Sequence, residues 1–282
     1  MAQIIDGKAI AARIKEEVAV EVKQMKQQGL APKLCVVLVG EDPASQVYVR
    51  YKEKDCEQVG IISETHRLQD KTKQQDLVDL IKRLNKDKSV HGILVQLPLP
   101  KGLDAISALN EISPEKDVDG LHPMNMGRLL RGENPDMQPC TPSGIIEMIL
   151  STGREIKGAN AVVVGRSNIV GKPVAIMLLQ RHATVTICHS RTKDIGAVCR
   201  EADILVASVG SPGLIKADMV KKDSVVIDVG VNRLHDRLVG DVDYEATKEQ
   251  AGFITPVPGG VGPMTRAMLL KNTIIAAKKA KK

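Results

Sequence analysis

Short apolar runs alternate with amphipathic segments along the whole chain, and this alternation restricts the fold more than any other feature. Runs of aliphatic residues at 34–39 and 92–97 are typical of buried strands, since a strand covered on both faces shows no polar side. Segment 7–28 instead places apolar residues three or four positions apart among Lys, Glu and Gln, which predicts a helix ended by Gly29. Strands that alternate with helices favour a parallel sheet covered by helices.

The alternation occurs twice, which predicts an α/β protein of two α/β domains. In the first series we also expect helices at 43–59 and 72–87 and a half-exposed strand at 61–68. Segment 110–143 is rich in Pro, Asp, Asn and Gly, and we expect a linker or a passage that lines a cleft. The second series comprises strands at 161–165, 184–188, 203–208, 225–229 and 252–255, helices at 143–152, 170–181, 194–201, 217–222 and 263–280, and a hairpin around Asp236.

Composition disfavours several functions. Only four of the 282 residues are aromatic, so the core must be aliphatic and base stacking on single-stranded nucleic acid is disfavoured. The net charge is +6, but the terminal KKAKK supplies four of these charges and leaves the rest nearly balanced, which argues against nucleic-acid binding. No apolar run approaches the ~18 residues of a membrane span, and the first residues lack a secretory signal pattern. We therefore expect a cytoplasmic protein that binds neither membrane nor nucleic acid.

Cysteine and histidine are scattered. The five cysteines form no CxxC pair, and the six histidines form no cluster with them. Disulfides and structural zinc sites need closer spacing, so we expect reduced thiols and no metal. Two carboxylates in the segment KDVDG at 116–120 can suggest a metal site or an acid/base pair, and the metal is disfavoured because no third oxygen-rich segment accompanies them.

The segment AVVVGRSNIVGKPVAIMLLQ at 161–180 has the strand–glycine–helix context of a dinucleotide loop. Only Gly165 matches the common GxGxxG pattern, because position 167 is Ser and position 170 is Val. The amides at the start of the following helix could still hold a phosphate. Ordinary packing of strand against helix is the open alternative for this segment.

The next strand favours NADP over NAD. NAD enzymes carry an acidic residue about 20 residues further on, which binds the ribose 2′-hydroxyl. Here the strand at 184–188 is followed by His189, Ser190 and Arg191, with no carboxylate. A hydroxyl and a cation suit a 2′-phosphate, and Arg166 is a second possible cation. A solvated turn would explain Arg191 equally well. The loops at 209–213 and 228–232 are consistent with a nicotinamide ribose site.

In the first domain, Tyr48 and Lys52 lie four residues apart in the expected helix and therefore share a face. A ring beside an amine makes a platform for a flat ligand, and partial burial would lower the pKa of the amine into a useful range. A Tyr packed on a surface Lys is the alternative. Gln96 ends an apolar strand and faces either solvent or a ligand. The segment TPVPGGVGPMT at 255–265 is either a shaped backbone surface or a stiff hinge.

Together these residues resemble the bifunctional methylenetetrahydrofolate dehydrogenase/methenyltetrahydrofolate cyclohydrolase family. The resemblance runs nearly end to end, and Ser167 belongs to the family's own version of the loop. It rests on six segments in order: YVRYK at 48–52, GILVQLPLP at 92–100, KDVDG at 116–120, PCTP at 139–142, VVGRSNIVGKP at 163–173 and TPVPGGVGPMT at 255–265.

The resemblance implies that NADP oxidises 5,10-methylenetetrahydrofolate and that water then converts the methenyl product to 10-formyltetrahydrofolate. It implies a catalytic folate-binding domain at 1–120 plus 263–282, a Rossmann-like NADP domain at 140–262 and a cleft between them. It also implies a cytoplasmic homodimer in one-carbon metabolism that supports purine biosynthesis.

The resemblance further assigns roles to residues of this chain. Lys52 would be central to the hydrolysis, Tyr48 would stack on the folate, and Gln96 would bind Lys52 or the substrate. Asp119 would accept hydrogen bonds from the pterin. The implied substrate-binding residues are Tyr48, Lys52, Val95, Gln96, Leu97, Asp119, Pro258, Gly259, Gly260, Val261 and Gly262. The implied cofactor-binding residues are Gly165, Arg166, Ser167, Ser190, Arg191 and Val231.

Two other functions fit parts of the sequence. An NADP oxidoreductase acting on a non-folate substrate would keep the segment 160–231 but would not need the set of Tyr48, Lys52, Gln96 and Asp119. A non-catalytic nucleotide-binding or interaction protein would tolerate the substitution Lys52→Ala. The presence of both Lys52 and Gln96 favours the bifunctional enzyme.

Overall fold

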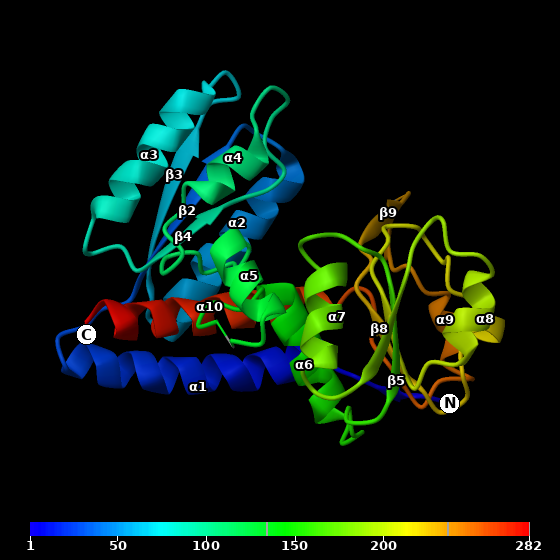
Figure 1. Cartoon of the computed structure of the whole chain (residues 1–282). Helices are drawn as coiled ribbons and strands as arrows, with labels where there is room; N and C mark the ends of the chain where they lie inside the picture. The colour runs from blue at the N-terminus through cyan, green and yellow to red at the C-terminus, as the bar shows by residue number, and fades with distance from the viewer. Residues whose placement is uncertain (134, 236, 282) are drawn as a thin grey trace. The chain divides into compact units, whose positions relative to one another are not determined.

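A computed structural model of the chain describes residues 1–133, 135–235 and 237–281 (Figure 1). Its contacts divide the chain into two compact units. Unit 1 contains Met1–Ala12 and Thr141–Thr265, and unit 2 contains Arg13–Cys140 and the residues from Arg266 onward. Helices α1 (Gly7–Gln27), α6 (Cys140–Ser151) and α10 (Val261–Ala280) contribute residues to both units.

Unit 2 is built on a three-stranded parallel sheet of order β3-β2-β4. The central strand β2 is buried along nearly its whole length, whereas the edge strand β3 is half-exposed, as its polar sequence predicts. One face is covered by α3, whose apolar stripe includes Leu77, Ile81 and Leu84 (Figure 1). The elements within unit 2 are β2 (Lys33–Val39), α2 (Pro43–Val59), β3 (Ile62–Leu68), α3 (Gln74–Lys86), β4 (Gly92–Val95), α4 (Ala105–Asn110) and α5 (Pro123–Leu130).

Unit 1 is built on a six-stranded parallel sheet of order β1-β11-β8-β7-β5-β6, the doubly wound type whose strand ends bind dinucleotides. Its central strands β5, β7 and β8 are mostly aliphatic and buried, apart from the exposed Asn160 that begins β5 and the buried Asp228 that ends β8. The elements within unit 1 are β1 (Gln3–Ile4), β5 (Asn160–Val164), α7 (Gly171–Leu179), β6 (Thr184–Cys188), α8 (Ile195–Arg200), β7 (Ile204–Ala207), the 3-10 turn η1 (Ala217–Met219), β8 (Val225–Asp228), β9 (Asn232–Leu234), β10 (Arg237–Val239), α9 (Tyr244–Thr247) and β11 (Phe253–Ile254).

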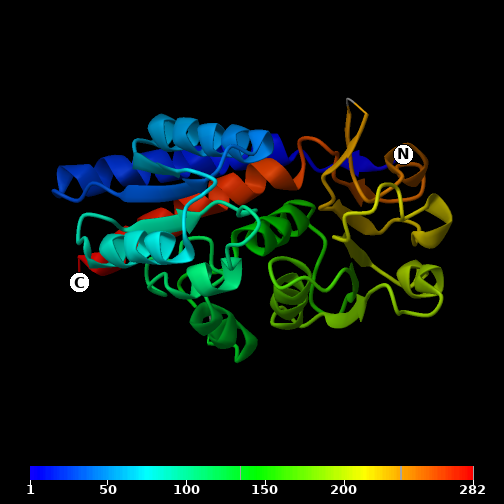
Figure 2. The same ribbon diagram turned by 90° about the horizontal axis from the view of Figure 1, so that it is seen from above.

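The long helices α1 and α10 lie side by side in unit 2 (Figure 2). Buried apolar residues repeat at helical spacing on both, including Ile14 and Val18 on α1 and Leu270 and Ile274 on α10. An ion pair between Glu21 and Lys278 joins their outer faces. The core is aliphatic as expected, since none of the four aromatic residues is buried. All five cysteines are buried free thiols.

The sequence prediction of two α/β domains, the second Rossmann-like, is confirmed, while the cleft stays a prediction. The compact units differ from the predicted domain ranges at three places, of which the smallest is 263–265, which groups with unit 1. Residues 1–12 group with unit 1, because β1 pairs with β11 and extends its sheet, and residues 121–140 group with unit 2.

Several element predictions need correction. The segment 110–143 is not a plain linker, because it contains α5, which begins with the His122 cap and Pro123. The last helix begins at Val261, two residues before the proline that we expected to start it. Short elements without periodicity, namely β1, α4 and α9, had no signal in the sequence. The expected hairpin is formed by β9 and β10, although Asp236 itself lies outside the described residues. Among the described helices, none combines the length and apolar character required to cross a membrane.

Candidate active site

Helix α2 carries the first candidate residues. Asp42 caps the helix by accepting a hydrogen bond from Ser45 N at 2.7 Å, Pro43 occupies its first turn, and Gly60 ends it in the left-handed conformation at φ 81°. Tyr48 and Lys52 therefore share a helical face, as the spacing predicts. Tyr48 is 41% exposed, so its ring is accessible, whereas Lys52 is partly buried.

Gln96 follows β4 and fixes the amine of Lys52. Its Oε1 accepts a hydrogen bond from Lys52 Nζ at 2.8 Å, and its Nε2 donates to the carbonyl oxygen of Leu97 at 2.7 Å. The second bond determines which end of the amide faces the amine. Val95, the last residue of β4, is buried, and Leu97 is half-buried beside Gln96. The structure thus brings together a helix residue and a strand-end residue that are 44 positions apart.

Asp119 completes the charged centre. Burial lowers the pKa of Lys52, and the nearby Asp119 carboxylate opposes this shift. Burial raises the pKa of Asp119, and Lys52 opposes that shift in turn. For both groups burial is the larger effect. The environment therefore favours the neutral amine and the neutral acid more than water does. A lysine whose pKa is lowered by burial is better able to accept a proton than an exposed lysine.

The loop that carries Asp119 is held by residues that the sequence analysis did not select. Asn272 Nδ2 on α10 donates to the carbonyl oxygens of Val118 and Gln138, both at 2.8 Å. Cys140 N donates to the Asp119 carbonyl oxygen at 3.2 Å, and Cys140 Sγ donates to Val118 O at 3.2 Å. The Asn272 contacts join segments more than 100 residues apart, so no local sequence signal could have shown them.

A second network fixes the other side of α2. The buried carboxylate of Asp55 forms ion pairs with Lys15 on α1 and with Arg266 on α10, the latter at 3.3 Å. The Arg266 guanidinium also lies over the ring of Tyr51, 4.7 Å from its centre. Asp55, which lies three residues after Lys52 on α2, thereby joins α2 to α1 and α10. The sequence offered no signal for this network, because an Asp in a charged helix is usually solvated.

In unit 1, the expected phosphate loop joins β5 to α7. Gly165 has φ 127°, and a Cβ there would collide with the backbone of Ser208 at the end of β7. A Cβ on Gly171 would collide with Gly165 O. The absence of a side chain at Gly171 therefore lets the start of α7 pack closely against the turn after β5. Ser167 Oγ accepts hydrogen bonds from Val170 N at 3.1 Å and Gly171 N at 3.2 Å. The serine therefore binds amides at the start of the helix.

The remaining cofactor candidates lie at the carboxyl ends of neighbouring strands. Arg166 follows β5, Ser190 and Arg191 follow β6, and Val231 follows β8, and all four are exposed. Within the described residues, neither guanidinium is paired with a carboxylate. Unpaired cations at this edge of a parallel sheet suit an anionic ligand.

The proline–glycine segment that precedes α10 lies in unit 1. A Cβ on Gly260 would lie 2.6 Å from Pro256 O, and a Cβ on Gly7 would collide with Gly260 O. Pro258 and Gly262 are exposed, whereas Gly260 and Val261 are buried and Gly259 is half-buried. Close backbone packing thus requires glycine at positions 7 and 260, whereas a Cβ on Gly262 would meet no other atom, and the exposed positions leave backbone surface free.

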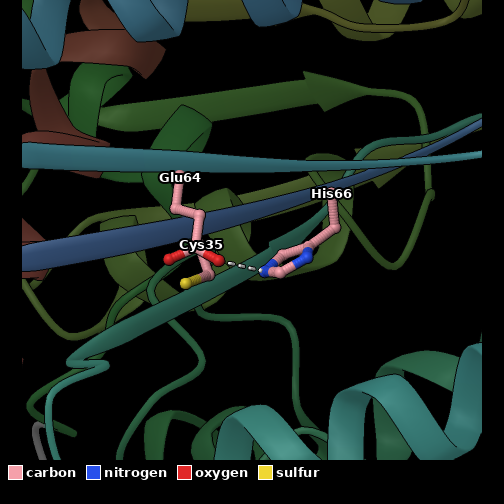
Figure 3. A group of neighbouring side chains, drawn as sticks. All are labelled: Cys35, Glu64 and His66. Carbon is pink, nitrogen blue, oxygen red and sulfur yellow. Dashed lines mark ion pairs between the residues drawn. The ribbon is translucent and has the colours of Figure 1, made fainter.

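One group of three possible metal ligands occurs among the described residues, formed by Cys35, Glu64 and His66 on β2 and β3 (Figure 3). Both oxygens of the Glu64 carboxylate are already engaged, one by Lys33 Nζ at 2.5 Å and one by His66 Nε2 at 2.9 Å. Burial raises the pKa of the Cys35 thiol to about 11. The Lys33 ammonium already supplies a positive charge beside the Glu64 carboxylate, the kind of charge that a metal would bring.

Taken together, the doubly wound sheet of unit 1 and the amine–amide–carboxylate centre of unit 2 define a two-domain dinucleotide-binding enzyme of the α/β class. Comparison with known proteins specifies it further. Residues 5–119 match the catalytic domain, and residues 139–281 the NAD(P)-binding domain, of the tetrahydrofolate dehydrogenase/cyclohydrolase family model. The chain belongs to this family.

Relatives match over their full lengths. The bifunctional protein FolD of Moorella thermoacetica is 60% identical over 279 residues, which cover 99% of each chain. The structure resembles that of the bifunctional FolD enzyme from Campylobacter jejuni, with a TM-score of 0.97, 47% identity and 99% coverage of each chain. It also resembles the Trypanosoma brucei enzyme complexed with NADP and an inhibitor, with a TM-score of 0.96, 41% identity and coverage of 100% of this chain and 99% of that one.

Proposed function

We propose that this chain catalyses two successive reactions, with Lys52 central to the second. NADP oxidises 5,10-methylenetetrahydrofolate to the 5,10-methenyl cation, and hydrolysis of the cation gives 10-formyltetrahydrofolate. The two activities and the use of NADP follow from membership of the family. The residue roles are our proposal, and the observation that carries them is the 2.8 Å hydrogen bond from Lys52 Nζ to Gln96 Oε1 beside Asp119.

Lys52 would move the proton in the hydrolysis. A water oxygen attacks the bridging carbon of the methenyl cation, and the proton that it loses passes to the neutral amine of Lys52. Lys52 then returns that proton to N5, the bond from the carbon to N5 breaks, and the hydroxyl on the carbon loses its proton to water as the formyl C=O forms on N10. One proton is released overall. Burial lowers the pKa of Lys52 and so increases the neutral fraction that this step needs.

Gln96 would keep that amine in place. Its amide is anchored to the Leu97 carbonyl, so Oε1 stays directed at Nζ whether the amine is neutral or charged. A neutral acceptor stabilises the ammonium less than a carboxylate would. Gln96 therefore orients Lys52 without returning its pKa to the usual value.

The folate would lie against Tyr48 and Asp119. The accessible Tyr48 ring offers a stacking surface. The 2-amino edge of the pterin presents adjacent N–H donors, which match the two oxygens of an Asp119 carboxylate. Burial raises the pKa of Asp119 and favours its neutral form, whereas hydrogen bonds from these donors would favour the ionised form. Val95 and Leu97 would flank Gln96, and the backbone of 258–262 would line the folate side.

NADP would bind at the carboxyl edge of the unit 1 sheet. Gly165 and Ser167 shape the loop for the pyrophosphate, and Arg166 or Arg191 with Ser190 would bind the 2′-phosphate. The exposed, unpaired guanidinium groups support this assignment. Val231 would contact the nicotinamide end. When bound, NADP accepts the hydride, and the protein positions it.

Several broader assignments rest on the resemblance alone. We propose a folate-binding domain at 1–120 plus 263–282 and an NADP domain at 140–262. We further propose a cytoplasmic homodimer whose formyl product serves purine biosynthesis.

Product identification tests the proposal. Purified protein is incubated with 5,10-methylenetetrahydrofolate and NADP, and the folates are separated by chromatography. A Lys52→Ser variant serves as the control for spontaneous hydrolysis. We expect 10-formyltetrahydrofolate from the unmodified chain and accumulation of the methenyl compound with the variant. Formation of neither product with NADP or NAD would refute the assignment.

A further inference from the structure

A buried carboxylate in unit 1 binds two loops together. Asp241 is fully buried. Its Oδ2 accepts hydrogen bonds from Val209 N at 2.6 Å and Gly210 N at 3.0 Å. Its Oδ1 accepts hydrogen bonds from Ser211 N at 2.8 Å and from Asn232 Nδ2 at 2.9 Å. One side chain thus satisfies three consecutive backbone amides and one side-chain amide.

These four donors belong to the loops that follow two adjacent strands. The amides of 209–211 lie just beyond β7, and Asn232 comes directly after Val231, beyond β8. In a doubly wound sheet, ligands bind outside these carboxyl ends. Backbone loops without their own regular structure keep a fixed shape only when their polar groups have fixed partners. Asp241 is that partner for the backbone of the 209–211 loop, and it also holds the side-chain amide of Asn232, the first residue of β9.

Asp241 is itself held by a second buried carboxylate. Asp228, at the end of β8, accepts hydrogen bonds from Asp241 N at 2.8 Å and Val242 N at 3.0 Å, and from Gly230 N at 3.0 Å. A Cβ on Gly240 would collide with the Asp228 carboxyl group. Burial raises the pKa of Asp228 to about 6, and the Asp241 charge adds to the shift. Asp228 therefore holds the backbone of 241–242 in place, and with it the Asp241 carboxylate.

We propose that Asp241 is a positioning residue for the dehydrogenase reaction, which fixes the 209–211 loop and Asn232 in the shape that receives the nicotinamide half of NADP. This inference rests on the proposed NADP site. It separates the two halves of the cofactor: Gly165, Ser167 and the two arginines would serve the adenosine and pyrophosphate side, and Asp241 would act only on the reactive side.

The substitution Asp241→Asn tests the inference, because it keeps the size of the side chain but turns one acceptor into an NH2 group that faces amide donors. Four quantities are measured: the Kd of NADP, the Kd of 2′,5′-ADP (which lacks the nicotinamide half), the kcat of the dehydrogenase, and the cyclohydrolase rate on added methenyltetrahydrofolate without NADP. Asp243→Asn is the matched control, because the Asp243 side chain is partly exposed and forms an ion pair with Lys216 at 3.3 Å on the surface.

We expect Asp241→Asn to weaken NADP at least tenfold and to lower the dehydrogenase kcat. The Kd of 2′,5′-ADP and the cyclohydrolase rate should stay within twofold, and Asp243→Asn should match the unmodified chain throughout. Equal losses for NADP and 2′,5′-ADP, a lost cyclohydrolase activity in soluble protein, or no change in NADP binding would each overturn the inference. If Asp241→Asn does not fold, the Asn232→Ala variant is tested instead. We expect it to weaken NADP binding without changing the Kd of 2′,5′-ADP or the cyclohydrolase rate. Failure of the unmodified chain to bind NADP would instead refute the proposed function.

Discussion

Replacing Gln96 by Glu should slow the hydrolysis by changing the charge state of Lys52. The substituted carboxylate would lie where Oε1 now accepts the 2.8 Å hydrogen bond from Lys52 Nζ. Burial lowers the pKa of Lys52 in the unmodified chain, and an adjacent negative charge would raise it again. Because the neutral amine is the active form in our proposal, the rising limb of the pH–rate profile should move to higher pH.

The size of the effect follows from the contact distance. An opposite charge this close favours the ammonium by about 1.4 to 4 kcal/mol, which reduces the neutral fraction about 10- to 1000-fold. The cyclohydrolase rate at neutral pH should fall by that factor and recover as the pH rises. Gln96→Met removes the acceptor without adding charge. It should lower the rate about 10- to 100-fold through the lost hydrogen bond, with a much smaller movement of the pH limb.

The assay follows the disappearance of methenyltetrahydrofolate absorbance at several pH values, with the spontaneous rate at each pH subtracted. Gln24→Glu on the exposed face of α1 adds the same charge away from Lys52 and should leave the profile unchanged. A Gln96→Glu variant with the rate and the pH limb of the unmodified chain would refute the role of Lys52 as a proton acceptor. So would a rate lowered equally at every pH.

Three further substitutions test other parts of the structure. Asp55→Ala leaves the partly buried cations of Lys15 and Arg266 unpaired and should cost about 3 to 5 kcal/mol of unfolding free energy in urea titrations; a loss below about 1 kcal/mol contradicts this. Gly165→Ala places a Cβ at φ 127° against the β7 backbone and should weaken NADP binding by about 1 to 3 kcal/mol in calorimetry, and unchanged binding would contradict the steric argument. Arg191→Glu should weaken NADP about 10- to 100-fold while changing NAD little, and equal losses for both cofactors exclude a 2′-phosphate role.

Local sequence patterns predicted most of the regular structure. The helix at 43–59 and the strand at 184–188 have the predicted bounds, because capping residues and apolar periodicity act over a few neighbouring positions. Most other bounds shift by one to three residues, since helix ends fray and strand ends depend on partners. Elements without periodicity were missed: β1 forms only because β11 offers it an edge to pair with.

The same division applies to the candidate sites. The sequence by itself determined that Tyr48 and Lys52 share a helix face, that the loop at Gly165 follows a buried strand, and, through six motifs, which family the chain resembles. The resemblance left open whether Gln96 binds Lys52 or the substrate, and the tertiary structure places its amide on the Lys52 amine. The tertiary structure alone decided that Asp55 joins three helices and that Asp241 binds the 209–211 loop and Asn232. The physical reason is range: caps and periodicity act within a few residues, whereas a buried charge finds its partners only when distant segments meet and water is excluded.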